Sequence, residues 1–409
     1  MKNYIVVTGG AGFVGSNLIK YLLLKTNKKI ISVDNYFSGS KKNHVNDRRV
    51  KYINANTFNI QKILDKYKKK ISVIFHFGEF ARIHQSFVNT EKCFSSNICG
   101  TSNVFYFCLK NKIKMKNYII VTGGAGFIGS NLIKYLLLKT NKKIISVDNY
   151  FSGSKKNHVN DRRVKYINAN TSNIQKILDK YKKKISVIFH FGEFARIHQS
   201  FVNTEKCFSS NICGTSNVFY FCLKNKIKII YSATSASLGN KGNDQSLSPY
   251  AFTKSKNLQL LNHLNKWFGL SYEALYFYNV YGQGHVRDGA MATVIGIFER
   301  QYKKKIPLTV VRPGTQSRKF THIDDTIKGC YYAWKINKNR HYSLSNMRSY
   351  TIKGVATLFT NNIKMIPVKL GERNKSSVVK KIGNITIHSF PCKTNLSSYI
   401  KNFKVNLDK

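Results

Sequence analysis

The chain is poor in proline, tryptophan, acidic residues and long apolar stretches. Its 409 residues include 5 Pro and 2 Trp, and only 18 Asp and Glu stand against 68 Lys and Arg. The low proline content argues against a collagen-like chain or a proline-rich low-complexity chain. No apolar stretch approaches the roughly 20 residues of a membrane-spanning helix, and the apolar residues 5–7 are too few for a secretory signal peptide. We therefore expect a cytoplasmic protein with no membrane partner.

The cysteines give no sign of a metal site or a disulfide framework. The sequence contains no CxxC pair and no Cys/His cluster with the spacing of zinc ligands. Reduced, mostly buried thiols are the usual state of cysteines in the cytosol. The sequence therefore predicts no metal site.

The excess of basic residues is only a weak indication of nucleic-acid binding. The formal net charge is +50, but only 13 of the 68 basic residues are Arg, and the charge is spread along the chain. Arg is the preferred side chain for contacts with bases and phosphates. We interpret most of the lysines as solvated surface and expect no nucleic-acid partner, although a basic protein still attracts an acidic small substrate such as a nucleotide sugar.

The first 228 residues are one sequence of 114 residues written twice. The copies, 1–114 and 115–228, differ only at the pairs Val6/Ile120, Val14/Ile128 and Phe58/Ser172. This period is far longer than the roughly 20–50 residues of solenoid repeats. It indicates a duplicated domain fragment, with an error in the gene or its assembly as the alternative. We predict three parts: a partial duplicate (1–114), a nucleotide-binding domain (115–284, with a late strand near 341–346) and a substrate domain (285–409).

Strands and helices alternate after Met115, which predicts parallel βαβ units in a doubly wound sheet of the Rossmann type. The expected strands are Tyr118–Val121, Lys143–Val147, Val164–Ile167, Ile185–His190, Lys228–Tyr231, Ser271–Phe277 and Tyr342–Leu344. The expected helices are Ser130–Lys139, Ile174–Tyr181, Asn211–Lys224 and Tyr250–Phe268. The first copy ends at Lys114 without a fifth strand, so we expect its sheet to keep an open edge.

A glycine motif, TGGAGFIGS, predicts a phosphate-binding turn. It places Gly123, Gly126 and Gly129 between an expected strand and an expected helix. Glycines at these positions permit a tight turn and close approach of the backbone to a pyrophosphate, and the helix N-terminus then faces the phosphates. Asp148 ends the next strand, where a carboxylate binds the adenosine ribose and favours NAD over NADP. The first copy has the same parts: Gly9, Gly12, Gly15 and Asp34.

Tyr250 and Lys254, in SPYAFTKSK, form a candidate catalytic pair. The pattern YxxxK recurs elsewhere in this Tyr- and Lys-rich chain, so the spacing alone indicates little. Tyr250 differs because it opens a helix soon after the hydroxyl-rich run YSATSAS, which follows an expected strand. A spacing of four places both side chains on one helical face. The ammonium favours the phenolate form of the tyrosine, which makes Tyr250 a candidate general base for a sugar hydroxyl.

Taken together, these motifs resemble the extended short-chain dehydrogenase/reductase family, and within it the NAD-dependent nucleotide-sugar epimerases and dehydratases, a group that includes UDP-glucose 4-epimerase. The resemblance covers residues 115–409 and rests on TGGAGFIGS, VDNYFSG, FHFGEFARIHQSF, SNICGTSNV, IIYSATSASLG, SPYAFTKSK, YFYNVYGQG and RKFTHIDD, in that order. It implies an NAD cofactor, a UDP-sugar or other nucleotide-sugar substrate, epimerisation through a transient keto-sugar, and a homodimer.

The same resemblance implies roles for individual residues. The catalytic residues would be Thr234, Tyr250 and Lys254. The cofactor-binding residues would be Gly123, Gly126, Phe127, Ile128, Gly129, Asp148, Asn149, Phe191, Gly192, Asn211, Tyr250, Lys254, Phe277 and Tyr278. The substrate-binding residues would be Thr234, Asn279, Arg318 and Arg373.

Three alternatives remain open at this point. A nucleotide-sugar dehydratase or reductase is the nearest, but a 4,6-dehydratase needs an acid pair after the catalytic threonine, and Ser235 and Ala236 stand there. An ADP-heptose-type epimerase would use Arg287 or Asp288, in HVRDGAM, as a second base. The last alternative is an NAD- or nucleotide-sugar-binding protein whose activity the duplication has disabled. Because the second copy is contiguous with the fifth strand, we expect residues 115–409 to form the enzyme.

Overall fold

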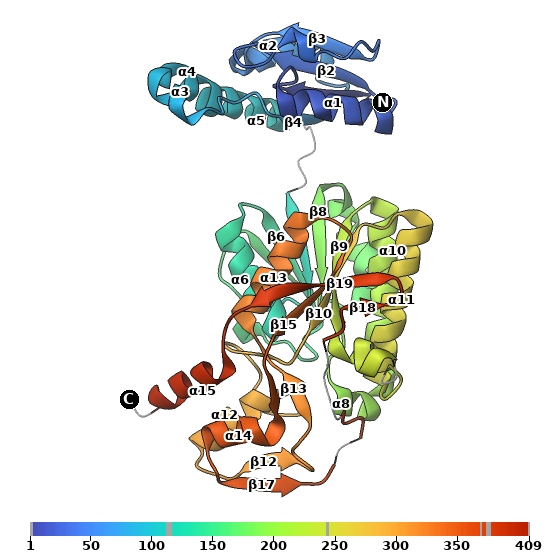
Figure 1. Cartoon of the computed structure of the whole chain (residues 1–409). Coiled ribbons are helices and arrows are strands. Elements are labelled where there is room, and N and C mark those ends of the chain that lie inside the picture. The colour runs from blue at the N-terminus through green and yellow to red at the C-terminus, as the bar shows by residue number, and fades with distance from the viewer. Residues whose placement is uncertain (1–2, 112–116, 243–244, 369, 374–377, 408–409) are drawn as a thin grey trace. The chain divides into compact units, whose positions relative to one another are not determined.

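The structure, a computed structural model, describes residues 3–111, 117–242, 245–368, 370–373 and 378–407. The chain divides into two compact units, Met1–Met115 and Lys116–Lys409, each of which is described here by itself (Figure 1). Over these described ranges, no helix is both long and apolar enough to cross a membrane.

The first unit is a four-stranded parallel sheet in the order β3-β2-β1-β4. Its strands are β1 (Tyr4–Thr8), β2 (Lys29–Asp34), β3 (Val50–Asn54) and β4 (Ile71–His76). Its helices are α1 (Phe13–Lys25), α2 (Ile60–Leu64), α3 (Ile83–Val88), α4 (Thr90–Phe94) and α5 (Thr101–Lys110). Among the described residues β4 pairs with β1 alone, so this sheet has the open edge that the sequence predicts.

The second unit contains a nine-stranded sheet in the order β18-β19-β15-β10-β9-β8-β5-β6-β7, parallel except for the pair β18 and β19. The strands are β5 (Tyr118–Thr122), β6 (Lys143–Asp148), β7 (Val164–Asn168), β8 (Ile185–His190), β9 (Lys228–Thr234), β10 (Tyr272–Phe277), β15 (His341–Asn346), β18 (Lys381–Ile382) and β19 (Ile385–Cys392). Strands β5, β6 and β8 are rich in buried Ile and Val, and every residue of β9 is buried, as expected where helices cover both faces of a parallel sheet. The predicted doubly wound α/β fold is confirmed.

Helices cover both faces of this sheet (Figure 1). Side chains of α7, α10 and α11 share one buried cluster with the strands, and those of α6 and α13 share another. The bounds are α6 (Phe127–Lys139), α7 (Ile174–Leu178), α8 (Ile197–Val202), α9 (Thr204–Phe208), α10 (Thr215–Asn225), α11 (Pro249–Phe268) and α13 (Ile323–Ile336). The helix expected to begin at Asn211 instead starts with a π-helical turn over Ser209–Gly214.

A smaller group of elements has its own apolar core, which includes Phe298, Leu308, Val355 and Phe359. It comprises β11 (Val280–Tyr281), α12 (Val294–Lys303), β12 (Leu308–Val311), β13 (Ser317–Lys319), β14 (Thr321–His322), β16 (Ser349–Thr351), α14 (Ile352–Phe359), β17 (Ile363–Ile366) and α15 (Leu396–Val405). These elements come from the part of the chain in which the sequence shows no strand–helix alternation.

One expectation about this region is wrong. The sequence predicts a substrate domain over 285–409, with only the strand near 341–346 in the main sheet, but β19 pairs in parallel with β15 and extends that sheet. The strand ITIHSFPC alternates apolar and polar residues and contains Pro391. A proline within a run normally argues for an edge strand or no strand at all, so this segment lacked the signal of a buried parallel strand.

Candidate active site

The glycine turn of the second unit lies tightly against the end of β8. Gly123 has φ +69°, and a Cβ there would lie 2.7 Å from the backbone of Phe191. A Cβ on Gly129 would lie 2.1 Å from the carbonyl oxygen of Gly123. Only glycine fits both positions. The turn before α6 therefore exposes backbone and no side chain at these two positions.

Asp148 joins this turn to the loop after β6. Its Oδ2 accepts a hydrogen bond from the backbone N–H of Ala125 at 2.9 Å, and its Oδ1 accepts one from the backbone N–H of Tyr150 at 2.8 Å. The neighbouring Asn149 is held by Asn170, whose Oδ1 accepts from the Asn149 side chain at 2.8 Å. The two residues thus have fixed positions at the carboxyl end of β6.

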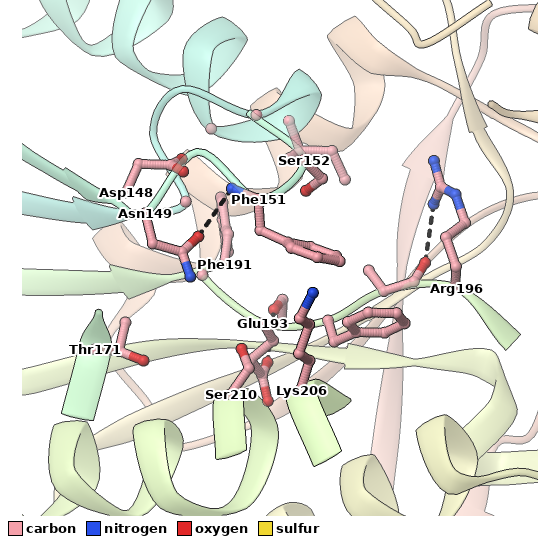
Figure 2. Close-up of a pocket in the computed structure, with 18 of the residues that line it drawn as sticks. Asp148, Asn149, Phe151, Ser152, Thr171, Phe191, Glu193, Arg196, Lys206 and Ser210 are labelled. Atoms are coloured by element: carbon pink, nitrogen blue, oxygen red, sulfur yellow. Dashed lines mark hydrogen bonds between the residues drawn. The ribbon is translucent and has the colours of Figure 1, made fainter. Parts of the chain in front are cut away.

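A cavity of about 480 Å³ extends from Asp148 to Tyr250 and Lys254. Figure 2 shows Asp148 and Asn149 at one end of it and Arg196 at the other. Most of the predicted cofactor-binding residues line it: Gly123, Gly126, Phe127, Ile128, Gly129, Asp148, Asn149, Phe191, Gly192, Tyr250, Lys254 and Phe277. A turn that only glycine fits, a helix N-terminus and a carboxylate at one end of the cavity suit the ADP half of a dinucleotide.

Two predicted cofactor residues lie in the core instead of on this wall. Asn211 is fully buried; its Oδ1 accepts from the Phe194 N–H at 2.6 Å, and its amide donates to the Thr253 hydroxyl at 3.0 Å. Tyr278 is also fully buried. Asn211 therefore fixes the loop after β8 and one face of α11, which places it one layer behind the cavity.

The start of α11 positions the candidate base. Ser248 caps the helix by accepting from the Ala251 N–H at 3.1 Å, and Pro249 stands in the first turn. Both are typical signals for the beginning of a helix. They place Tyr250 on the first turn, where it lines both this cavity and a second one.

The second cavity, of about 550 Å³, reaches from Tyr250 to the smaller group of elements. All four predicted substrate-binding residues line it: Thr234, Asn279, Arg318 and Arg373. Arg318 donates to Glu372 Oε1 at 2.6 Å, and the Asn279 amide donates to the Lys319 carbonyl at 2.9 Å. Since Tyr250 lines both cavities and Thr234 the second, the two cavities meet at the candidate catalytic groups.

Lys254 has a partner that the sequence analysis missed. Its ammonium forms a buried ion pair with Glu193 and also donates to the Ser232 carbonyl. Glu193 stands in FHFGEF, directly after the fourth strand, in a chain with few acidic residues. A lone carboxylate in a mostly apolar run draws attention to this position, but Glu79 in the first copy has the same surroundings in sequence.

Arg196 and Glu372 also line the cavities without having been predicted. Arg196 borders both cavities and donates to the Met291 carbonyl at 2.6 Å. Burial lowers the pKa of its guanidinium from the usual value. Nothing in the spacing of these residues marked them, because the segments that they join are far apart in the sequence.

A buried histidine supports the floor of the first cavity. His190, the last residue of β8, is bonded through Nδ1 to the Thr122 hydroxyl at 2.7 Å and through Nε2 to the Thr215 hydroxyl at 2.9 Å. Burial lowers the pKa of His190 to about 4. It is therefore a neutral structural group at physiological pH.

The first unit repeats the glycine turn but not the rest of the site. Gly9 has φ +67°, and the Ala11 N–H donates to Asp34 Oδ2 at 2.8 Å, as in the second unit. Counterparts of Thr234, Tyr250 and Lys254 do not occur, because the duplicated sequence ends before them. Across the described residues of the chain, no three His, Cys, Asp or Glu side chains gather as metal ligands would.

Comparison with known proteins agrees with this geometry. A sequence model of the NAD-dependent epimerase/dehydratase family matches residues 5–118 and 119–345. The chain is 31% identical over 230 residues to a Bacillus subtilis (strain 168) protein named as an uncharacterised UDP-glucose epimerase; the match covers 52% of this chain and 70% of that one. It is 32% identical over 225 residues to the ADP-L-glycero-D-manno-heptose-6-epimerase of Brachyspira hyodysenteriae, covering 51% and 69% respectively.

The fold is also found among solved structures. The crystal structure of a UDP-glucose 4-epimerase from Thermotoga maritima with UDP-glucose superposes with a TM-score of 0.62 at 21% identity. The superposition covers 71% of this chain and 99% of that one. At this level of identity the similarity concerns the fold.

Proposed function

The chain belongs to the NAD-dependent epimerase/dehydratase family, and on this premise we propose that its second unit is an NAD-dependent nucleotide-sugar epimerase that acts most readily on a UDP-sugar at C4. The observation that carries the proposal is the meeting of two cavities at Tyr250. One cavity has the glycine turn and Asp148, and the other has Thr234, Asn279, Arg318 and Arg373.

Each candidate catalytic residue has a definite task in this proposal. Tyr250 takes the proton of the sugar hydroxyl and later returns it, and Thr234 donates a hydrogen bond to the same oxygen. Lys254 lines the first cavity together with Tyr250 and would donate to the bound cofactor. Bound NAD supplies the hydride acceptor and later the donor, so the cofactor ends as it began.

The charges of the second cavity suit a nucleoside diphosphate. Arg318 and Arg373 line it together with a single acidic side chain, Glu372. Arginine binds phosphate oxygens through two parallel N–H donors. A diphosphate would replace the Glu372 carboxylate as the partner of Arg318.

Two observations favour C4 epimerisation over the heptose-type alternative. Arg287, one candidate for a second base, donates to Glu299 at 2.7 Å, and Asp288, the other, pairs with Arg300 at 2.8 Å. Neither residue lines either of the two cavities. A second base needs to reach the sugar carbon, so this segment does not supply one in the described geometry.

The test is an assay of the purified full chain with a panel of nucleotide sugars. We expect UDP-glucose and UDP-galactose to interconvert, with loss of at least a hundredfold in kcat for Tyr250→Phe and no effect on folding. Preferential turnover of an ADP-heptose would contradict the proposed substrate. Retention of NAD with no turnover across the panel would identify a binding protein instead.

A further inference from the structure

Glu193 lies beneath the candidate active site as a fully enclosed carboxylate. It stands three residues after the end of β8 and lines the first cavity with Gly192 and Phe194, yet its side chain is only 1% exposed. Figure 2 shows it below Asn149 and Phe191, close to the wall of the first cavity. A charged group this deeply buried needs several partners to offset the loss of hydration.

Four donors converge on this carboxylate. Its Oε1 accepts hydrogen bonds from Thr215 at 2.9 Å, Tyr231 at 3.1 Å and Asn257 at 3.1 Å. Its Oε2 accepts from the Lys254 ammonium. The Ser232 hydroxyl lies 3.4 Å from Oε2 but donates its one hydrogen to the His190 carbonyl at 2.9 Å. Because an ionised carboxylate accepts hydrogen bonds and donates none, this surrounding matches the charged form.

The same contacts fix the position of Lys254. Its side chain is almost fully buried, with the ammonium directed at Glu193 and at the Ser232 carbonyl. An ammonium has three N–H donors, and Lys254 also lines the first cavity beside Tyr250. Two donors are thus used by Glu193 and the Ser232 carbonyl. The third has only a long contact, 3.4 Å to the Ser232 hydroxyl, which a ligand in the cavity would replace.

The duplicated copy shows what this arrangement depends on. Glu79 is the equivalent residue of the first unit, where β9 and α11 have no counterpart, and its side chain is 47% exposed. It accepts from Thr101 at 2.9 Å, as Glu193 does from Thr215, and otherwise lies 3.8 Å from His76. The local sequence therefore supplies the threonine contact in both units. The lysine contact exists only in the second unit, where α11 follows β9 and supplies Lys254.

From this geometry we propose that Glu193 is a positioning residue for Lys254: it holds the charged ammonium in the wall that Lys254 shares with Tyr250, where the ammonium would donate to a bound dinucleotide. The proposal rests on the proposed function of the same site and extends it to a carboxylate outside the Thr234, Tyr250 and Lys254 set. Lys254 is then positioned before any cofactor enters.

The test compares Glu193→Gln with the matched control Glu79→Gln in the full chain. We expect Glu193→Gln to lower kcat at least tenfold and to weaken NAD binding severalfold, because Lys254 loses its charged partner. The KM for the nucleotide sugar should stay within twofold, because Lys254 lines only the first cavity. Glu79→Gln should match the unaltered chain in all three quantities.

A double-mutant cycle with Lys254→Met separates positioning from a general structural role. In the Lys254→Met background, Glu193→Gln should lower neither kcat nor NAD affinity further. It should also raise the melting temperature of that variant, because it removes a buried charge left without its partner. This last comparison holds even if Glu193→Gln alone folds poorly.

Two results would overturn the proposal. One is a Glu193→Gln variant with kcat and NAD affinity within twofold of the unaltered chain. The other is a loss of the same size whether Lys254 is present or replaced. NAD affinity and melting temperature need no substrate, so they decide the role of Glu193 even if no nucleotide sugar is turned over and the proposed function fails.

Discussion

His190 and His341 are the residues at which acid should weaken the second unit. His341 is bonded to the hydroxyls of Tyr272 and Tyr276, each at 2.9 Å, and burial lowers its pKa to about 4, as it does that of His190. An exposed histidine titrates near 6.5. Between about pH 6.5 and pH 4, both imidazoles are therefore neutral in the folded unit but protonated in the unfolded chain.

We predict that the free energy of unfolding of the second unit falls as the pH drops from about 6.5 towards 4. The unfolded state binds more protons in this window, so acid favours it. At pH 5 each histidine contributes a loss of roughly 2 kcal/mol. The loss is measured by urea unfolding at pH 7 and at pH 5 with tryptophan fluorescence as the signal. This signal reports the second unit, because both tryptophans, Trp267 and Trp334, belong to it.

The control for this prediction is His341→Gln, which removes one titrating group and keeps a polar side chain. The difference in unfolding free energy between the two pH values should shrink by about half. An unchanged difference would show that other groups govern the acid sensitivity.

At the scale of single residues, spacing predicted the glycine turn and Asp148, whereas Tyr250 and Lys254 were distinguished by their place in a helix that opens soon after a hydroxyl-rich run. Glu193 escaped prediction for a physical reason. Its burial depends on Lys254 and Asn257, which follow more than sixty residues later. The same local sequence leaves Glu79 half exposed, so no local pattern distinguishes the two settings.

At the scale of elements, the segment formed by β9 and α11 decides how much of a copy is buried. Phe219 on α10 is fully buried and packs edge-on against Tyr231 of β9, with ring centroids 5.4 Å apart. Its equivalent Phe105 on α5 is 51% exposed. The two copies present nearly identical faces, but the chain contains β9 and α11 only once. These two elements cover the face of the second unit.

We predict that Phe219→Ala and Phe105→Ala differ sharply although they alter the same sequence position. The first should destabilise the second unit by about 3 kcal/mol or more, as is usual for a buried phenylalanine. The second should change the stability of the first unit by less than about 0.5 kcal/mol.

Hydrogen exchange read by mass spectrometry can check each unit separately. Peptides that contain Val6 or Ile120 have different masses and so report β1 and β5 individually. Phe219→Ala should reduce protection of the β5 peptide, and Phe105→Ala should leave the β1 peptide unchanged. Equal effects would mean that the two faces are covered alike.

The order of the first strands and helices could be predicted because parallel βαβ units have strong local patterns. The position of β19 could not. Its alternating residues and Pro391 resemble an edge or a loop, and only pairing with β15 makes it a strand of the main sheet. Tertiary contact decided that element.

At the scale of the whole molecule, we assign the proposed catalysis to the second unit alone. Both units have an intact glycine turn and an aspartate that accepts a hydrogen bond from it. Among the cavities described, the two that meet at Tyr250 belong to the second unit. The first unit has no counterparts of Thr234, Tyr250 and Lys254, the groups proposed for the chemistry.

The most direct test places the same substitution in both turns, Gly126→Val and Gly12→Val, in the full chain. A Cβ at Gly126 would lie 3.2 Å from the Gly123 carbonyl oxygen, and one at Gly12 would lie 3.3 Å from that of Gly9, so both changes press on the turn to nearly the same degree. Gly126 lines the first cavity, and valine there would obstruct the phosphates. We predict at least a hundredfold loss of epimerase turnover for Gly126→Val and no loss for Gly12→Val. Equal loss from both variants, or full activity after Gly126→Val, would contradict the proposal that the second unit alone is catalytic.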